Sequence, residues 1–162
     1  MLFIILLFSS CVERIDYPKE PVIKYKDFYI YSQNNFETGV FVISFTDGDG
    51  DIGLAHKDTL PPFNPGSKYF FNFFMTFYQQ IDGNFEVIVD YDGNVVEYNS
   101  RIPPVNPDDE PQNLRGDIYI DIDISILKAV LGNNNVIKIE AYIVDRNLNY
   151  SNTIITPPLI LP

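Results

Sequence analysis

Apolar and polar residues alternate with a period of two over most of the chain, and this pattern restricts the possible folds most. In "DIYIDIDI" (117–124), four isoleucines share one face, while three aspartates and a tyrosine share the other. The segments "VFVISFTD" (40–47) and "VIKIEAYIVD" (136–145) alternate in the same way. A strand of an antiparallel sheet with one buried face has this period. The sequence therefore predicts an all-β protein.

Turn signals separate the alternating segments. "DGN" occurs at 82–84 and again at 92–94, and "GNNN" occupies 132–135. Such residues favour tight connections between strands. Only "SILKAVLG" indicates a helix, with at most one short turn near 125–131. We predict an immunoglobulin-like antiparallel β-sandwich of seven or eight strands, a single domain over 25–162. Its strands lie near 25–32, 38–46, 68–80, 84–90, 94–99, 117–124, 136–144 and 150–156.

The N-terminus, "MLFIILLFSSC", indicates export and anchoring. Its apolar run over 1–10 is shorter than the ~20 residues that a membrane-spanning helix needs. It ends in small residues followed by Cys11, the only cysteine. This arrangement resembles a bacterial lipobox, which implies a signal peptide over 1–10, a lipidated Cys11 and a polar tether over 11–24. An ordinary secretion signal and a buried N-terminal strand with a free thiol are the alternatives.

The charge of the chain limits its partners. The formal net charge is −11, with 22 acidic residues against 11 basic ones. Nucleic-acid binding requires a basic surface, so no nucleic-acid partner is expected. The acidic excess agrees better with cation binding.

The acidic segment "FTDGDGDIGL" (45–54) is the strongest candidate for a cation site. Asp47, Asp49 and Asp51 alternate with glycines, whose backbone freedom allows several oxygens to point to one place. Calcium binds six to eight oxygens, and three crowded carboxylates repel one another without a cation. An EF-hand is excluded, because its required glycine and glutamate positions hold Ile52 and Asp58. The alternative is an acidic turn whose carboxylates face water.

A second segment, "VDRNLNYSN" (144–152), supplies further oxygens at Asp145 and Asn147. In a sandwich, the connections after 38–46 and 136–144 lie at the same end. Asp145 and Asn147 are therefore expected to complete a calcium site with the three aspartates. A hairpin turn with asparagines in left-handed conformations is a compatible interpretation.

The lipobox cysteine, "FTDGDGDIG" and the closing "YIVDRNLNYSNTIITP" together resemble a group of small lipoproteins from the Bacteroidota. The closing segment is also similar to the final hairpin of bacterial immunoglobulin-like domains, which reads V-x-D-x-x-G-N-x-S. Asn149 matches that pattern, whereas Leu148 replaces its glycine. The resemblance implies a cell-envelope location, lipid-anchored to the outer membrane, and little chemistry.

Candidate catalytic residues are sparse. His56 is the only histidine and stands in a polar loop, and the sequence has no G-x-S-x-G motif. Asp121 and Asp123 match the spacing of the solvated face of a strand. We therefore expect no catalysis and a binding or scaffold role, with an extracytoplasmic metal-dependent hydrolase as the alternative.

The segment "KYFFNFFMTFYQQ" (68–80) has aromatic residues on both faces of the expected strand. Phe70, Phe74 and Tyr78 form the face that the core does not need. They are either covered by a proline-rich loop or open as a patch for an envelope protein partner. A glycan partner is the third possibility, against which the absence of tryptophan counts.

Overall fold

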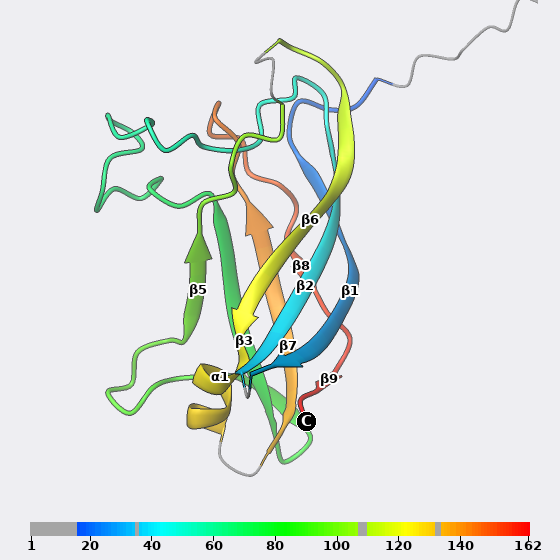
Figure 1. Ribbon diagram of the computed structural model, residues 1–162, viewed down its shortest axis with the longest axis vertical. Helices are drawn as coiled ribbons and strands as arrows, with labels where there is room; N and C mark the ends of the chain where they lie inside the picture. Colours follow the sequence, from blue (N-terminus) through cyan, green and yellow to red (C-terminus); the bar gives the residue numbers. More distant parts are fainter. Residues whose placement is uncertain (1–15, 35, 107–109, 132–133) are drawn as a thin grey trace, which may run out of the picture.

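The computed structural model describes residues 16–34, 36–106, 110–131 and 134–162, which form two antiparallel sheets packed as layers (Figure 1). One sheet has the order β1 (Val22–Gln33), β2 (Phe36–Asp47) and β6 (Leu114–Asp123). The other contains β3 (Phe73–Ile81), β4 (Asn84–Val87), β5 (Glu97–Ser100), β7 (Val136–Ile143), β8 (Ile154–Ile155) and β9 (Leu159–Ile160). The all-β sandwich predicted from the alternation is confirmed.

Three connections cross between the sheets: β2 to β3, β5 to β6, and β6 to β7. Crossings of this kind occur in immunoglobulin-like sandwiches and place alternate loops at one end of the molecule. The long loop after β2 and the short loop after β7 lie together at the upper end in Figure 1. The topology therefore brings together the two acidic segments.

The core consists of the apolar faces that the alternation identified. On β7, Ile137, Ile139, Ala141 and Ile143 are all inaccessible to solvent. Phe41 of β2 and Phe73 of β3 meet between the sheets, with ring centroids 6.4 Å apart. Burial of an aromatic or branched side chain of this size contributes about 1.5–3 kcal/mol. Hydrophobic contact between the two sheets therefore stabilises the sandwich.

Strand β2 is buried on both faces, whereas the alternation of its residues predicted one buried face and one exposed face. Val42 is 3% exposed although it points away from the core side of Phe41 and Ile43. It lies between Asp27 of β1 and Tyr119 of β6 in the sheet register. A central strand is covered by the side chains of both neighbours, and this explains its burial.

The domain begins earlier than expected. Strand β1 begins at Val22, so the last residues of the predicted tether are part of the sheet. Pro18 O also accepts a hydrogen bond from Gly48 N at 2.8 Å, and Tyr17 N donates to Asn113 Oδ1 at 2.8 Å. Cys11 and the apolar run 1–10 lie outside the described residues. Among the residues that are described, no helix has the length and apolar character needed to cross a membrane.

Other boundaries also differ from the predictions. Strand β3 begins at Phe73 rather than near 68, and the expected strands 84–90 and 94–99 shorten to β4 and β5, beyond which Val89 and Val95 form an isolated bridge. The expected strand 150–156 is reduced to β8, and β9 follows it. Helix α1 (Ile124–Leu131) has eight residues rather than one turn. It begins after Asp123, whose Oδ1 accepts a hydrogen bond from Ser125 N at 2.9 Å, as a helix N-cap does.

Candidate metal centre

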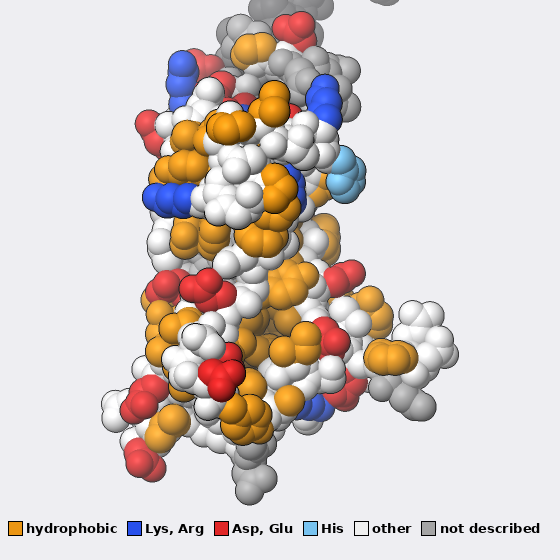
Figure 2. All heavy atoms as spheres, turned by 90° about the vertical axis from the view of Figure 1, so that its left-hand side faces the viewer, with side chains coloured by type: hydrophobic (Ala, Val, Ile, Leu, Met, Phe, Trp, Pro, Cys, Tyr) orange, Lys and Arg blue, Asp and Glu red, His pale blue; other side chains and the backbone are white. Residues whose placement is uncertain are grey.

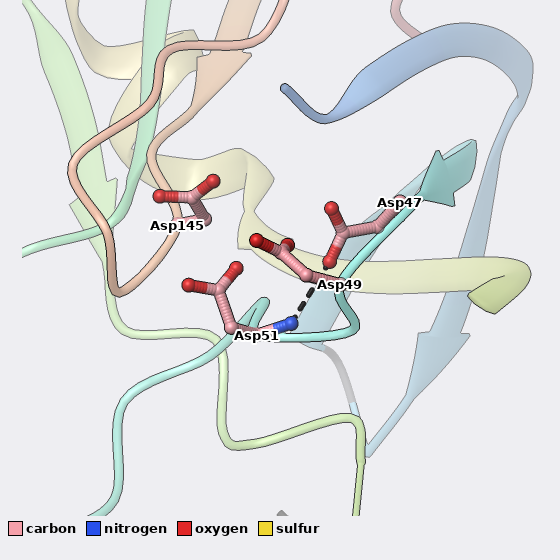
Figure 3. A group of neighbouring side chains, drawn as sticks. All are labelled: Asp47, Asp49, Asp51 and Asp145. Atoms are coloured by element: carbon pink, nitrogen blue, oxygen red, sulfur yellow. Dashed lines mark hydrogen bonds between the residues drawn. The ribbon is translucent and has the colours of Figure 1, made fainter. Parts of the chain in front are cut away.

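Four aspartates from two loops meet at one end of the sandwich. Asp47 ends β2, Asp49 and Asp51 follow it, and Asp145 follows β7. One carboxylate oxygen from each lies within 4.8 Å of the corresponding oxygens of the others. Figure 3 shows the four carboxylates directed toward a shared space. The predicted convergence of Asp145 with the acidic loop is confirmed.

The shared space contains oxygens that have no hydrogen-bond partner. Asp47 is inaccessible to solvent and Asp145 is 1% exposed. The Oδ1 atoms of Asp47, Asp49 and Asp51 are buried and unpartnered. A buried carboxylate oxygen without a partner costs several kcal/mol of desolvation, and three in one place add mutual repulsion. Such an arrangement is stable when a cation occupies the space.

The acidic loop is held in its curled shape by its backbone. Asp51 N donates to Asp47 Oδ2 at 2.9 Å, which closes the turn around the cluster. Gly50 has a φ of 73°, a conformation that favours glycine, and an added Cβ there would lie 2.7 Å from Gln112 O. Gly50 is therefore required by both conformation and close packing, and Gly48 by close packing, since a Cβ there would clash with Tyr17 O.

Asp145 is held by the hairpin turn that follows it. Asn149 donates from its backbone N to Asp145 Oδ1 at 2.8 Å and from its Nδ2 to Asp145 Oδ2 at 2.9 Å. Leu148 has a φ of 66°. Leu148 therefore adopts the left-handed conformation that glycine has in the similar hairpins, whereas we expected this conformation at the asparagines. Asn149 was not among the predicted site residues, although its position four residues after Asp145 is that of a turn-closing donor.

Asn147 lies at the site but acts as a donor. Its backbone N donates to Asp51 Oδ2 at 3.0 Å, and its Nδ2 donates to Asp49 Oδ2 at 3.4 Å. These bonds occupy the outer oxygens of the two aspartates and leave their Oδ1 atoms directed inward. The structure thus gives Asn147 a positioning role beside the cluster, where the sequence analysis expected a ligand.

The electrostatics of the cluster reflect its crowding. Burial, followed by the charge of Asp49, raises the pKa of Asp47 from 3.8 to about 6. Burial, followed by the charges of Asp145, Asp49 and Asp47, raises the pKa of Asp51 to about 7. The pKa of Asp145 is also raised, mainly by burial. Without a cation, folding therefore makes ionisation of these aspartates less favourable than it is in water.

The donor set fits a hard divalent cation. All the donors are hard carboxylate oxygens, which calcium, magnesium and manganese prefer over zinc or copper. Oxygens on opposite sides of a calcium ion lie up to about 5 Å apart, and around magnesium they lie only about 4 Å apart. The four oxygens all lie within 4.8 Å of one another, so they can share one such ion. Four protein oxygens leave at least two positions for backbone carbonyls or water.

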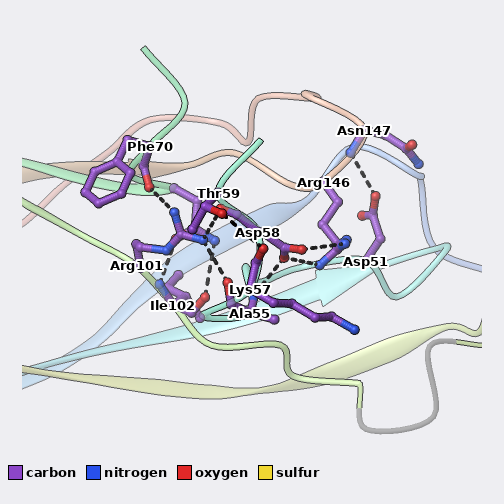
Figure 4. A network of polar contacts seen from close by, with 11 residues as sticks. Asp51, Ala55, Lys57, Asp58, Thr59, Phe70, Arg101, Ile102, Arg146 and Asn147 are labelled. Atoms are coloured by element: carbon purple, nitrogen blue, oxygen red, sulfur yellow. Dashed lines mark hydrogen bonds and ion pairs between the residues drawn. The ribbon is translucent and has the colours of Figure 1, made fainter. Parts of the chain in front are cut away.

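A network of arginines connects the cluster to the long loops, and sequence analysis missed it (Figure 4). Arg146 forms an ion pair with Asp58, in which Nη1 of the arginine lies 2.7 Å from Oδ2 of the aspartate. The backbone N of Arg146 also donates a hydrogen bond to Asp51 O. Desolvation of Asp58 opposes ionisation, but its bonds from Ala55 N and Arg146 keep its pKa below the usual value. Arg101 donates to the carbonyls of Phe70, Ala55 and Asp58. The loop 53–72 is therefore held against the site.

The expected aromatic patch is not a single surface. Phe70 lies in the loop before β3, edge-on to Phe71 and beneath the Arg101 guanidinium. Phe74 stacks on Tyr142 with ring centroids 4.8 Å apart, and Tyr78 OH donates to Glu140 Oε2. All three side chains are half-buried. Neighbouring side chains cover them, and the view from the side of β5 shows apolar side chains mixed with acidic ones (Figure 2).

The remaining catalytic candidates do not converge. His56 is exposed in the loop after β2. Asp121 and Asp123 are exposed on β6, and Asp123 serves as the helix N-cap. Within the described residues, the only group of three or more His, Cys, Asp or Glu side chains placed to hold a metal is the aspartate cluster.

Comparisons with protein-family models, curated proteins and solved structures gave no match to this chain. The functional assignment therefore depends on the residues of the site and their geometry. Those residues define a candidate centre for a hard divalent cation between the loops after β2 and β7.

Proposed function

We propose that the protein is a non-catalytic binding or accessory module of the cell envelope, with a structural calcium ion between two loops of its sandwich. The observation that carries the proposal is the set of three buried, unpartnered carboxylate oxygens on Asp47, Asp49 and Asp51. A calcium ion would be bound by these oxygens and by Asp145. It would remove the repulsion between them and connect the loop after β2 to the hairpin after β7.

Two features support a structural role for the ion. Asp47 and Asp145 lie below the protein surface, and Asn147 and Asn149 fix the surrounding carboxylates by hydrogen bonds. A site fixed in this way has its largest effect on the stability of the loops it joins. These loops also contact Pro18 and the segment around Gln112, so the ion would order a whole end of the domain.

One observation favours a hydrolase as the second candidate. A hollow of about 470 Å³ adjoins the cluster and is lined by Asp49, Asp51, Lys19 and Arg146 among others. A catalytic metal requires such an open side. However, the Arg146 guanidinium is engaged by Asp58, and the lining includes no histidine, serine, threonine or cysteine. The structural role is therefore the better supported of the two.

A calcium titration of thermal unfolding tests the metal centre. For a dissociation constant of about 0.1–1 mM, 10 mM calcium is expected to stabilise the folded state by about 1–3 kcal/mol relative to chelator. Magnesium at the same concentration should give a much smaller shift, because magnesium demands near-ideal octahedral geometry and loses its bound water reluctantly. Asp49→Ala should remove the calcium shift. If calcium did not change the melting temperature of the unmodified protein, residues 45–54 would be an acidic turn without a bound ion.

The envelope location is part of the proposal and rests on the sequence around Cys11. We propose that Cys11 carries the lipid and that membrane attachment depends on it. Cys11→Ser is expected to prevent incorporation of labelled fatty acid and to transfer the protein from the membrane fraction to the soluble fraction. The melting temperature should not change, because the folded domain begins later in the chain. Unchanged labelling of Cys11→Ser would refute the anchor.

A further inference from the structure

A second hollow, unrelated to the aspartate cluster, lies over the three-stranded sheet. Its volume is about 570 Å³, within the range of small-molecule sites. It is lined by polar side chains from all three strands and by Tyr17. Two adjacent rows of the sheet form it: Val22, Thr46 and Arg115 in one row, and Lys24, Ser44 and Asp117 in the next. Hydroxyl groups therefore lie in the middle, on β2, with Lys24 and Arg115 on the flanking strands.

The two cations of the hollow are not neutralised by the protein. Asp117 is the only carboxylate in the lining, and it forms an ion pair with Lys26. Over the part of the chain that the structure describes, Lys24 and Arg115 have no carboxylate oxygen within 4.0 Å. Both side chains are exposed. The protein has a net charge of −11, so a hollow with two unpaired basic side chains differs from the rest of its surface. The local positive charge favours binding of an anion there.

The size and chemistry of the hollow indicate the class of anion. Two cations match one carboxylate or sulfate group, and arginine can bind either with paired hydrogen bonds. The acidic surface elsewhere repels a polyanion such as nucleic acid. Ser44 and Thr46 offer hydroxyls that donate to or accept from other hydroxyls, and the Tyr17 ring supplies an apolar wall with a polar edge. A hydroxylated ring that bears one negative charge uses all of these groups.

We propose that this hollow binds an anionic sugar, with its carboxylate or sulfate between Lys24 and Arg115 and its ring against Tyr17. The inference rests on the proposed function only in assigning the protein a binding role. It does not require the calcium ion, because none of the four aspartates lines the hollow.

The test is a calorimetric titration of the full-length protein in detergent with D-glucuronate, D-glucose 6-sulfate and D-glucose. At least one of the two charged sugars is expected to bind about tenfold or more tightly than glucose, because hydrogen bonds to a charged group are stronger than hydrogen bonds to a hydroxyl. Which of the two binds more tightly identifies the acidic group. Equal binding of glucose, or no binding of either charged sugar, would overturn the proposal. Acetate separates a sugar site from a simple anion site, and acetate binding as tight as that of glucuronate would also overturn it.

Variants locate the binding. Arg115→Gln and Lys24→Gln are each expected to weaken binding of the charged sugar by about tenfold. Lys57→Gln removes the same charge from an exposed lysine in the loop after β2 and should change nothing. Tyr17→Leu should weaken binding of the charged sugar but leave binding of acetate unchanged. Unchanged affinity in Arg115→Gln would refute the assignment.

Chelator separates this site from the metal centre, because a sugar carboxylate can also coordinate calcium. Binding that persists in chelator and decreases in Arg115→Gln supports the hollow, even if the calcium titration is flat. Binding that disappears in chelator and is retained in Arg115→Gln would assign the sugar to the metal centre and contradict the proposal.

Discussion

In calcium-free buffer at pH 7.5, Asp47→Asn is expected to raise the free energy of unfolding by about 2–3 kcal/mol and also to abolish the response to calcium. The first effect follows from the pKa of Asp47, which rises from 3.8 to about 6 in the folded protein. Each unit corresponds to about 1.4 kcal/mol, so the charged carboxylate destabilises the calcium-free fold by about 3 kcal/mol at this pH. Asparagine removes the charge and retains an oxygen that can accept the Asp51 N–H.

The second effect follows from the loss of a ligand. Asp47 is the most deeply buried member of the acidic loop, and its unpartnered Oδ1 faces the shared space. A neutral amide is a weaker ligand for calcium and leaves the site one negative charge short. We expect no upward shift of the melting temperature of Asp47→Asn over a titration to 10 mM calcium. Stabilisation in chelator combined with loss of the calcium response distinguishes a metal ligand from a residue that only supports the fold.

Asp121→Asn is the matched control for this experiment. Asp121 is exposed on β6, remote from the cluster, and the same change of charge should alter stability by no more than about 0.5 kcal/mol in either buffer. If Asp47→Asn destabilised the calcium-free protein, repulsion within the cluster would not be significant and the argument for a cation would fail.

The second large effect concerns pH. For Asp47 and Asp51 the folded-state pKa values, about 6 and about 7, lie above the ordinary value of 3.8. Between pH 4 and pH 7 the folded state therefore binds more protons than the unfolded state, and stability falls as the pH rises. The effect is absent below about pH 4 and complete above about pH 7. Asp47 alone contributes about 3 kcal/mol, which corresponds to about 6–12 °C in the melting temperature of a domain of this size.

Thermal unfolding at pH 5.0, 6.0 and 7.5 in metal-free buffer measures this dependence. Calcium at 10 mM should reduce or reverse it, because the ion competes with protons for the same oxygens. Asp47→Asn should show a smaller dependence than the unmodified protein. Asp58, whose pKa is lowered, contributes stability that is lost only as the pH falls below about 4, outside this range. A calcium-free protein that is as stable at pH 7.5 as at pH 5.0 would contradict the assignment.

The two proposals assign different chemistry to two nearby parts of the molecule. The metal centre begins at Asp47, the last residue of β2, and the anionic-sugar hollow is lined by Ser44 and Thr46 just before it. The metal centre contains carboxylates with unpartnered oxygens. The hollow contains basic side chains that form no ion pair with any residue that the structure describes. In combination they describe a module whose calcium ion orders one end of the sandwich beside a surface that binds a partner.

Local pattern was sufficient to predict the sandwich, because it depends on which residues avoid water. The isoleucines of β6 and β7 alternate with polar residues, and this alternation determines both the strands and their buried faces. The convergence of Asp145 with the acidic loop also followed from the sequence, since strand order in a sandwich places those loops at one end. The turn at Asp82 and Gly83 between β3 and β4 followed from the sequence as well. Strand lengths did not, because β5 and β8 are shorter than their apolar segments suggested.

Only the tertiary structure decided which side chains act together. Phe70 and Phe74 are close in sequence, but a loop separates Phe70 from β3, and Arg101 covers it. Asn147 resembles a ligand in sequence, yet its donors are directed at the aspartates. The ion pair of Arg146 with Asp58 joins residues from distant segments. The sheet likewise places Lys24 and Arg115 on opposite sides of β2, in adjacent rows. A sequence pattern records the environment of each residue along its own strand, whereas these contacts depend on how the strands and loops pack in three dimensions.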